Sequence, residues 1–239
     1  MLIPSSRFTT AISGEDARLR LLVVGAGAQA RYVIETARSL DEVVVIGLVD
    51  TFDNRALWGH RIEDIEIVGG VDVLDRVRPE PDLRVVLAVA DRDHKRSLAA
   101  QLSDSGHVFE AVIHPRAIIA HTATVAAGCI INAGVVVESG ARIDAHAIVH
   151  SGTVIEHDVV VEEFANVGPG VTTAGRVRIG PGAIIYSGAT LIPNVTIGRD
   201  AIVGAGSVVL ADVPEAVTVA GVPARILTRN PRRPSQDRD

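Results

Sequence analysis

The residue pair with the clearest chemical potential is His157-Asp158, in the segment HSGTVIEHDVVV. An imidazole can accept a proton at neutral pH, and an adjacent carboxylate can orient the ring and stabilise its charged form. Gly175 follows three hexapeptides after His157. A glycine leaves its backbone N–H group accessible, where it can stabilise negative charge that develops on an oxygen. If these groups lie side by side, they could assist nucleophilic attack on a carbonyl carbon. The alternative interpretation is that His157 is only a solvated histidine at a corner.

A second group of residues has the spacing of a nucleotide site. The segment GAGAQA, which contains Gly25 and Gly27, follows the strand-like run RLLVV and opens a helical pattern. In that context backbone N–H groups can approach a phosphate. Asp50 ends the next strand-like run, from where a carboxylate can reach a ribose or a base. We favour nucleotide binding, with a simple tight turn and a solvated strand-end carboxylate as the alternatives.

The elements that must position His157 repeat with a period of six. Fifteen of the sixteen positions spaced by six from 119 to 209 are aliphatic, and Thr173 is the exception. Such a period fits neither an α-helix, whose face repeats every 3.6 residues, nor an ordinary hairpin sheet. It predicts a left-handed parallel β-helix, a triangular prism in which three hexapeptides form one coil and aliphatic side chains stack inward.

The prism geometry has three consequences. Residues separated by one full coil lie above one another at about one strand spacing, roughly 4.8 Å, which places Gly175 beside His157. The flat faces of about five coils need covering, and packing around a threefold axis does this, so we expect a homotrimer. The segment VPEAVTVAGVPARIL should leave the prism as a cap before the polar tail NPRRPSQDRD.

The chain before the prism alternates strand-like and helix-like patterns, which indicates a small parallel α/β sheet of Rossmann-like type. Helical runs are expected from about Arg31 to Leu40 and near Arg92–Ser103. We therefore expect an N-terminal extension over residues 1–19, a Rossmann-like nucleotide-sugar domain over 20–113, a left-handed β-helix over 114–212, and a cap with a polar tail over 213–239.

Composition narrows the possible partners. The 23 Lys and Arg and 29 Asp and Glu residues give a net charge of −6, with no basic block outside the tail, so we expect no nucleic-acid partner. No segment has the signal-peptide pattern or the roughly 18 apolar residues of a membrane span. We expect a soluble, cytoplasmic protein. The single cysteine, Cys129, excludes an internal disulfide.

A metal site within one chain is not expected. Among the prism histidines, only His121 and His157 share a column, and they lie two coils apart with Ser139 between them. Two strand spacings put these histidines roughly 10 Å apart, which is too far for one ion to bind both.

Several segments then point to a known family. They resemble, in order and spacing over about residues 20–227, the sugar acyltransferases typified by bacillosamine N-acetyltransferase and the sialic acid O-acetyltransferase group. The segments are GAGAQA, GLVD, IVGGVDVL, LAVADRDHKR, HPRA, VIEHDVVVEEF, AGRVRIG, VGAGSVVLADVP and AGVPAR. The specific part is VIEH followed by an acid, and then AG-x-V-x-IG one coil later.

The resemblance implies that the N-terminal domain binds a nucleotide-sugar and that acetyl-CoA lies in the groove between neighbouring prisms. His157 would be the general base, Asp158 would orient it, and the Gly175 N–H would meet the thioester oxygen in a direct transfer. It also implies contacts with acetyl-CoA from Asn166, Gly188 and Ala205, and contacts with the nucleotide-sugar from Gly25, Gly27, Ala28, Asp50, Asp91 and His150.

The sequence departs from that family at four positions. Asn166 stands where members often have a histidine that contacts the acetyl group, and His150 stands where the bacillosamine enzyme has an asparagine. Thr51 replaces a second acid, and Gln29 replaces the histidine of the glycine-rich motif. These departures leave the sugar and the nucleotide open.

We therefore expect an acetyl-CoA-dependent N-acetyltransferase that acts on the amino group of a nucleotide-linked 4-amino-4,6-dideoxy sugar. The alternatives are O-acetylation of a sialic acid or related sugar, transfer of another acyl group, and an NAD-binding protein without acyltransferase activity.

Overall fold

The computed structural model describes residues 18–227 of the chain. The chain divides into two compact units. One contains the residues up to Ala117 together with Val125–Ala133, and the other contains Ile118–Thr124 and the residues from Gly134 onward. The polar tail and nearly all of the N-terminal extension expected from the sequence lie outside the described residues.

The first unit is built on a five-stranded sheet with the strand order β3-β4-β2-β1-β5. Strand β1 lies between β2 and β5 and pairs with both in parallel, while β3 and β4 pair antiparallel. The strands are β1 (Leu19–Val24), β2 (Val43–Val49), β3 (Arg61–Ile62), β4 (Ile65–Gly69) and β5 (Leu83–Leu87). The middle of this sheet is fully buried, as the continuous β-branched runs in the sequence require.

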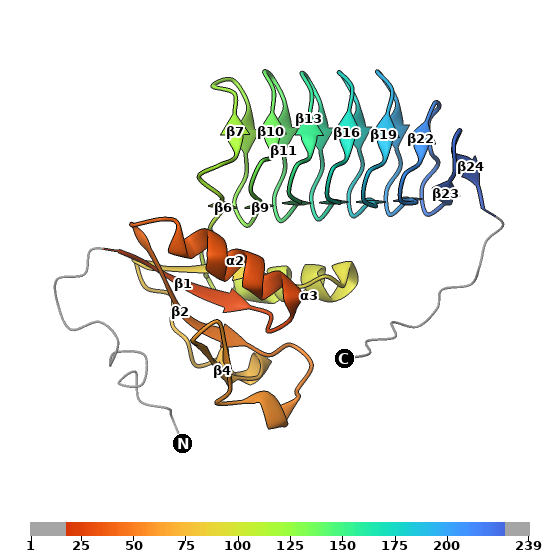
Figure 1. The fold of residues 1–239 in the computed structure, drawn as a ribbon. Coiled ribbons are helices and arrows are strands. Elements are labelled where there is room, and N and C mark those ends of the chain that lie inside the picture. The colour runs from red at the N-terminus through yellow and green to blue at the C-terminus, as the bar shows by residue number, and fades with distance from the viewer. Residues whose placement is uncertain (1–17, 228–239) are drawn as a thin grey trace. The chain divides into compact units, whose positions relative to one another are not determined.

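The unit has two α-helices: α2 (Ala28–Arg38) connects β1 to β2, and α3 (Arg92–Asp104) follows β5 (Figure 1). Both form where the sequence predicts helices, although α2 begins at Ala28, ahead of the expected start near Arg31. Two 3₁₀ turns, η1 (Arg55–Leu57) and η2 (Val71–Val73), belong to the same unit. Strand β6 (Val112–Ile113) pairs in parallel with β9 (Ile130–Ile131).

The second unit is a stack of repeating coils, drawn in green to blue in Figure 1. Strands three hexapeptides apart pair in parallel, as in the register of Val136 with Val154 and of Val160 with Arg178. The six-stranded sheet contains β7 (Ile118–Ile119), β10 (Val136–Val137), β13 (Val154–Ile155), β16 (Thr172–Thr173), β19 (Thr190–Leu191) and β22 (Val208–Val209). The coil length predicted from the period of six is thus confirmed.

The other faces of the prism are built in the same way. One has β8 (Thr124–Val125), β11 (Arg142–Ile143), β14 (Val160–Val161), β17 (Arg178–Ile179) and β20 (Thr196–Ile197). The other has β12 (Ile148–Val149), β15 (Asn166–Val167), β18 (Ile184–Ile185) and β21 (Ile202–Val203). From Val137 to Val209, every inward position of the period is buried, Thr173 included.

The stack ends in a short cap. Strand β23 (Thr218–Ala220) extends the face of β21, and β24 (Arg225–Ile226) pairs antiparallel with β23. The antiparallel strand β24 ends the repeat, because all strands of the coils before it pair in parallel.

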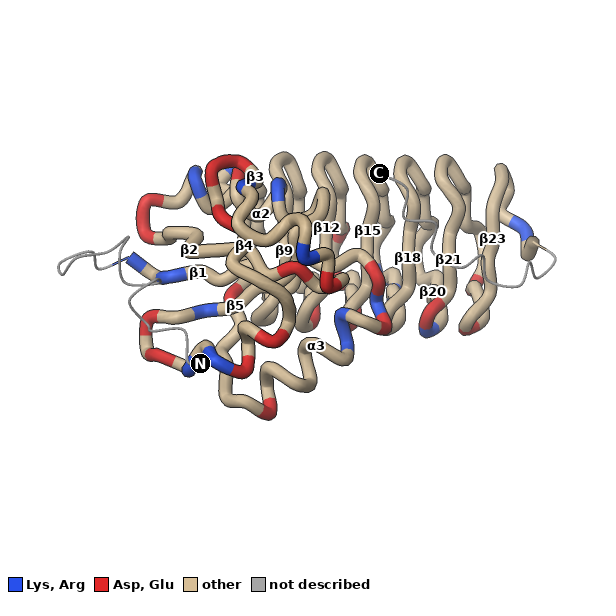
Figure 2. The backbone as a smooth tube through the Cα atoms, turned by 90° about the horizontal axis from the view of Figure 1, so that it is seen from below, with Lys and Arg blue, Asp and Glu red and all other residues tan. Residues whose placement is uncertain are grey.

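Most charged positions of the described chain lie in the N-terminal unit, and few lie on the prism (Figure 2). Lys and Arg are mixed there with Asp and Glu and form no basic block. No helix within residues 18–227 is both long enough and apolar enough to cross a bilayer.

Candidate active site

His157 occupies the corner between β13 and β14. Its side chain is 47% exposed, and Nδ1 lies 3.0 Å from Oδ2 of Asp158. With Nδ1–H donating to this carboxylate, the Nε2 atom of neutral His157 is left as the proton acceptor. This is the arrangement that a general base and an orienting carboxylate would need.

Hydrogen bonds to the preceding coil and to the following coil hold the backbone of this corner. Asp158 has a φ of 60°, in the left-handed region that aspartate tolerates better than most residues. Its N–H donates to the Ser139 carbonyl (3.1 Å), and the His157 carbonyl accepts from the Arg176 N–H (2.9 Å). The coils before and after thus determine where the His157 side chain leaves the prism.

Gly175 sits at the same corner one coil later. A Cβ atom added to it would be 2.5 Å from Cε1 of His157 and closer still to Nε2, so only glycine leaves room for this ring. The Gly175 carbonyl accepts from the Asn194 N–H (3.2 Å). Its own N–H group has no acceptor anywhere in residues 18–227, which leaves a backbone donor next to the proposed base.

The other residues expected to contact acetyl-CoA lie elsewhere on the prism. Asn166 is on β15, a strand of a different face. Gly188 lies in the corner between β18 and β19, and Ala205 lies in the equivalent corner between β21 and β22. One chain therefore brings His157, Asp158 and Gly175 together, but it does not bring Asn166, Gly188 and Ala205 to the same corner.

The glycine turn lies at the carboxyl end of β1. A Cβ at Gly25 would overlap the Ala88 carbonyl, whose carbon would be 2.8 Å away, so this glycine allows the turn to pass close to the end of β5. Gly27 is the N-cap of α2 and has open space around it. Ala28 is the first residue of the helix, which has no side-chain cap. The first N–H groups of α2 therefore remain available to an anion.

Asp50 has a clear structural role at the end of β2. It is buried, and its carboxylate accepts hydrogen bonds from the Phe52 N–H (3.1 Å), the Asn54 N–H (2.5 Å) and Nε1 of Trp58 (3.4 Å). These bonds shape the loop that follows β2. A nucleotide contact from Asp50 would have to use the lone pairs that this loop leaves free.

Asp91 caps the helix after β5. Its Oδ1 accepts from the His94 N–H (2.8 Å), which makes it the N-cap of α3. His94 in turn contacts Phe52, with ring centroids 6.0 Å apart. Because β1 separates β2 from β5 in the sheet, this ring contact spans the exit of β1, where the glycine turn lies.

Sequence reasoning missed Phe52 and His94. Phe52 is 68% exposed, and aromatic residues make up only 3% of the chain. The available signal was an isolated aromatic residue three positions after the end of β2. The buried Nε2 of His94 and the buried Oε1 of Gln29, in the first turn of α2, have no hydrogen-bond partner among the described residues. Buried polar atoms without partners are rare, and they mark places where a ligand can supply one.

His150 is buried at the end of β12. Its N–H donates to the Val167 carbonyl (2.9 Å), and its carbonyl accepts from the Thr153 N–H (3.3 Å). Within the described residues, no group of three or more His, Cys, Asp or Glu side chains could hold a metal ion.

Lys95 is a buried titratable group in the first turn of α3. Burial lowers the pKa of its amine from 10.5 to about 7, and the neighbouring Cys129 thiol acts in the opposite direction. Its charge therefore changes near neutral pH, unlike that of a surface lysine.

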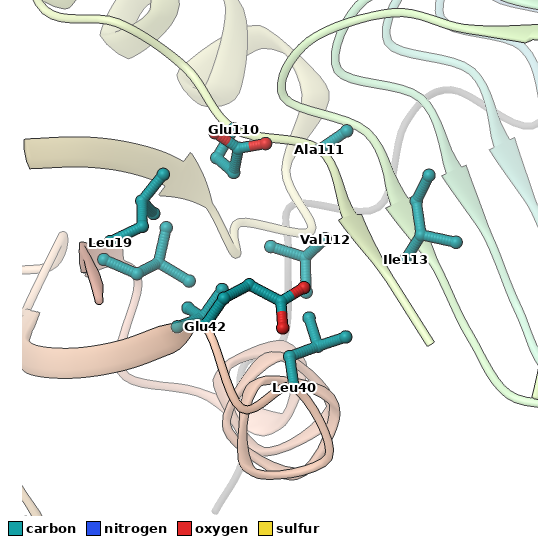
Figure 3. Close-up of a pocket in the computed structure, with 9 residues that line it drawn as sticks. Leu19, Leu40, Glu42, Glu110, Ala111, Val112 and Ile113 are labelled. Atoms are coloured by element: carbon teal, nitrogen blue, oxygen red, sulfur yellow. The ribbon is translucent and has the colours of Figure 1, made fainter. Parts of the chain in front are cut away.

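A small cavity of about 220 Å³ opens at the amino ends of β1 and β2 (Figure 3). Its lining is mostly aliphatic, with two acidic side chains: Leu19, Leu21, Leu40, Glu42, Val43, Glu110, Ala111, Val112 and Ile113. The glycine turn and Asp50 lie at the opposite ends of these strands, so this cavity is not the candidate nucleotide site.

Comparisons with known proteins agree with the fold described above. The family described as Bacterial transferase hexapeptide (six repeats) matches residues 176–211. A histidine-to-asparagine variant of perosamine N-acetyltransferase from Caulobacter crescentus, solved with CoA and GDP-perosamine, is 32% identical, with a TM-score of 0.82 over 87% of this chain and 97% of that one. The chain belongs to the hexapeptide-repeat sugar acyltransferases.

Other solved members are similar. The acetyltransferase domain of PglB from Neisseria gonorrhoeae FA1090, solved with acetyl coenzyme A, is 28% identical, with a TM-score of 0.81 over 88% of this chain and all (100%) of that one. WeeI from Acinetobacter baumannii AYE has the same fold, at 24% identity and a TM-score of 0.69 over 87% of this chain and 99% of that one. A comparison with curated protein sequences finds no match. The family membership makes this protein an acyltransferase with a left-handed β-helix.

Proposed function

We propose that this sugar acyltransferase moves the acetyl group of acetyl-CoA to the amino group of a nucleotide-linked amino sugar. The observation that carries the proposal is the position of the His157 imidazole, paired with Asp158 and lying against the bare backbone of Gly175. The matched structures of the perosamine enzyme and of PglB, which contain CoA or acetyl-CoA, support the choice of acyl donor.

The proposed reaction is a direct transfer. The amine nitrogen of the sugar attacks the thioester carbonyl carbon, while Nε2 of His157 takes a proton from that nitrogen. Negative charge develops on the carbonyl oxygen, where the Gly175 N–H can donate a hydrogen bond. The carbon–sulfur bond then breaks, and the proton passes from His157 to the leaving thiolate of CoA. Asp158 holds the Nδ1–H tautomer throughout.

The N-terminal unit would hold the nucleotide, as a Rossmann-like domain over about residues 20–113. Gly25, Gly27 and Ala28 would offer backbone N–H groups at the start of α2 to the phosphates. Asp50 and Asp91 would shape the loops on either side of this turn. The unpartnered atoms of Gln29 and His94 support the same location, because both lie on the first turns of helices that begin at this edge of the sheet.

We also propose a homotrimer with active sites shared between subunits. Residues 114–212 would form the prism and 213–239 the cap and tail. Asn166, Gly188 and Ala205 lie on other faces and corners of the prism than His157. A single acetyl-CoA could therefore meet both groups only if a second copy of the chain presents them beside His157. Sedimentation or light scattering that gave a monomer with full activity would refute this arrangement.

The test of the function is a thiol-release assay with acetyl-CoA and a panel of acceptors. The panel should pair each nucleotide 4-amino-4,6-dideoxy sugar with its 4-hydroxy analogue, and include free sialic acid. We expect thiol release and an N-acetylated product with amino acceptors alone. Acetylation of the hydroxyl acceptors instead would reassign the enzyme to O-acetylation, and no release with any acceptor would refute the proposal.

A further inference from the structure

Thr173 is the one residue that breaks the aliphatic inward column of the prism, and its side chain is completely buried in β16. Its hydroxyl lies between two backbone groups of the preceding coil. Oγ1 accepts from the Glu156 N–H (3.2 Å) and donates to the Val154 carbonyl (3.4 Å). Both partners belong to the segment that leads directly into His157.

The hydrogen bond from the Glu156 N–H replaces a regular backbone hydrogen bond between coils. At equivalent positions, the N–H of one coil donates to a backbone carbonyl of the next coil: Glu138 to Ile155 (2.8 Å) and Ala174 to Leu191 (2.9 Å). The equivalent acceptor for the Glu156 N–H would be the Thr173 carbonyl. The Glu156 N–H donates to the Thr173 hydroxyl instead.

The strand ladder is one residue pair shorter at the same place. Strands β10 and β13 pair through two residues each, and so do β16 and β19. Strands β13 and β16 pair through Val154 and Thr172, and the pairing of Ile155 with Thr173 that would complete this ladder does not form within the described prism. The local irregularity therefore falls immediately before the corner that carries His157.

The cause is the chemistry of a hydroxyl in an apolar interior. A buried hydroxyl without a hydrogen bond is costly, so the Thr173 side chain takes partners from the nearest backbone groups. An oxygen on a side chain cannot occupy the position of the backbone carbonyl that it replaces. The peptide of Glu156 is therefore held at a different place from its counterparts in neighbouring coils, and His157 follows it in the chain.

We propose that Thr173 is a positioning residue whose hydroxyl sets the corner that places His157 against Gly175 and Asp158. The inference rests on the proposed role of His157 as the base. Thr173 touches neither substrate nor the reacting atoms, and it acts through the Glu156 peptide.

The test compares three variants of the full-length enzyme. Thr173→Val has the shape of threonine without the hydroxyl, and Thr173→Ser keeps the hydroxyl. Thr153→Val is the matched control, because Thr153 is equally buried in the prism but its hydroxyl donates to the Gly168 carbonyl, away from this corner. Each variant is measured for kcat, for KM of both substrates, and for thermal unfolding.

We expect Thr173→Val to lower kcat by roughly 10- to 100-fold, the scale of a small misplacement of a catalytic group. Both KM values and the unfolding temperature should stay near those of the wild type, because valine suits the apolar interior and the Glu156 N–H can return to the Thr173 carbonyl. Thr173→Ser and Thr153→Val should retain kcat. Loss of kcat in Thr153→Val, a weak Thr173→Ser enzyme, or an unchanged Thr173→Val enzyme would overturn the inference.

A double variant separates this inference from the proposed function. If Thr173 acts only through His157, Thr173→Val should have no further effect on kcat in a His157→Ala background. A further loss in that background would overturn the positioning role. If His157→Ala alone remains fully active, the proposed base is wrong and the inference is overturned with it. If His157→Ala is inactive while Thr173→Val is normal, only the inference is overturned.

Discussion

The imidazole of His157 occupies the space that a side chain on Gly175 would need, one coil further along the prism. The contact follows directly from the repeat of the triangular coil, which places the two residues at the same corner. Gly175 has no side chain, which leaves room for the imidazole ring. Its backbone N–H group has no acceptor among the described residues. The proposed base and the proposed donor to the oxyanion therefore lie at one corner of the prism.

Gly175→Ala should lower kcat by roughly 10²-fold, the scale seen when a catalytic group is displaced by about 1 Å. The new methyl group would collide with the His157 ring and push it from the corner. Circular dichroism and the oligomeric state should be unchanged, since this glycine does not have a positive φ that alanine would strain. Wild-type turnover by this variant would show that the ring position is unimportant.

Asp158→Asn should lower kcat by about 10²-fold or more, because an amide can present its NH₂ group to Nδ1 and favour the wrong tautomer of His157. The fold should tolerate the change, since Asp158 is exposed and asparagine also accepts its positive φ. Equal kcat values for this variant and the wild type, over a full pH profile, would remove Asp158 from the mechanism.

Phe52→Ala should raise the KM for the nucleotide-sugar roughly tenfold, the scale of one stacking contact with a base. The reason is the exposed ring of Phe52, which meets His94 across the exit of β1. The KM for acetyl-CoA should not change. Binding can be followed by fluorescence of Trp58, the single tryptophan, whose indole donates to Asp50 in the same loop.

The control for this variant is Asp53→Asn, which alters the neighbouring exposed side chain without removing an aromatic ring. An equal rise of KM in both variants would attribute the effect to the loop as a whole. An unchanged KM in Phe52→Ala would place the base elsewhere.

The buried amine of Lys95 should make stability depend on pH. Its pKa is lowered to about 7 in the folded protein and returns to 10.5 on unfolding, so between these values the unfolded chain holds a proton that the folded protein lacks. The free energy of unfolding should then rise with pH, by up to about 1.4 kcal/mol per pH unit from this group. Below pH 7 the contribution is lost, because the folded protein must bury the charge.

The measurement compares urea unfolding of the wild type and of Lys95→Met at pH 7 and pH 9. Methionine cannot titrate, so the stability advantage of the variant should shrink as the pH rises. The same difference between the two proteins at both pH values would show that Lys95 does not lose its proton in this window.

The sequence predicts the prism well because its signal is periodic and long. An inward residue at every sixth position specifies the coil, and the coil brings Gly175 to the same corner as His157. The glycine turn and the helix that follows it are equally local features, although the bare N-cap Gly27 allows α2 to start before Arg31.

Side-chain partners across the fold were less predictable. The burial of Lys95 depends on which face of α3 meets the sheet, and a short run of polar residues does not reveal that face. The place of Asp50 at a strand end suits either a ligand contact or a solvated carboxylate, and the sequence does not indicate the loop that its carboxylate binds. Thr173 is visible in the sequence as a break in the aliphatic column, but the sequence does not show which backbone groups its hydroxyl binds.

The most direct test of the proposed mechanism is the turnover of His157→Ala with acetyl-CoA and the best nucleotide amino sugar from the panel. We predict a kcat at least roughly 10²-fold lower, as expected for a lost general base, with both substrates still bound and the oligomer intact. Acetyl transfer at the wild-type rate in this variant would contradict the account.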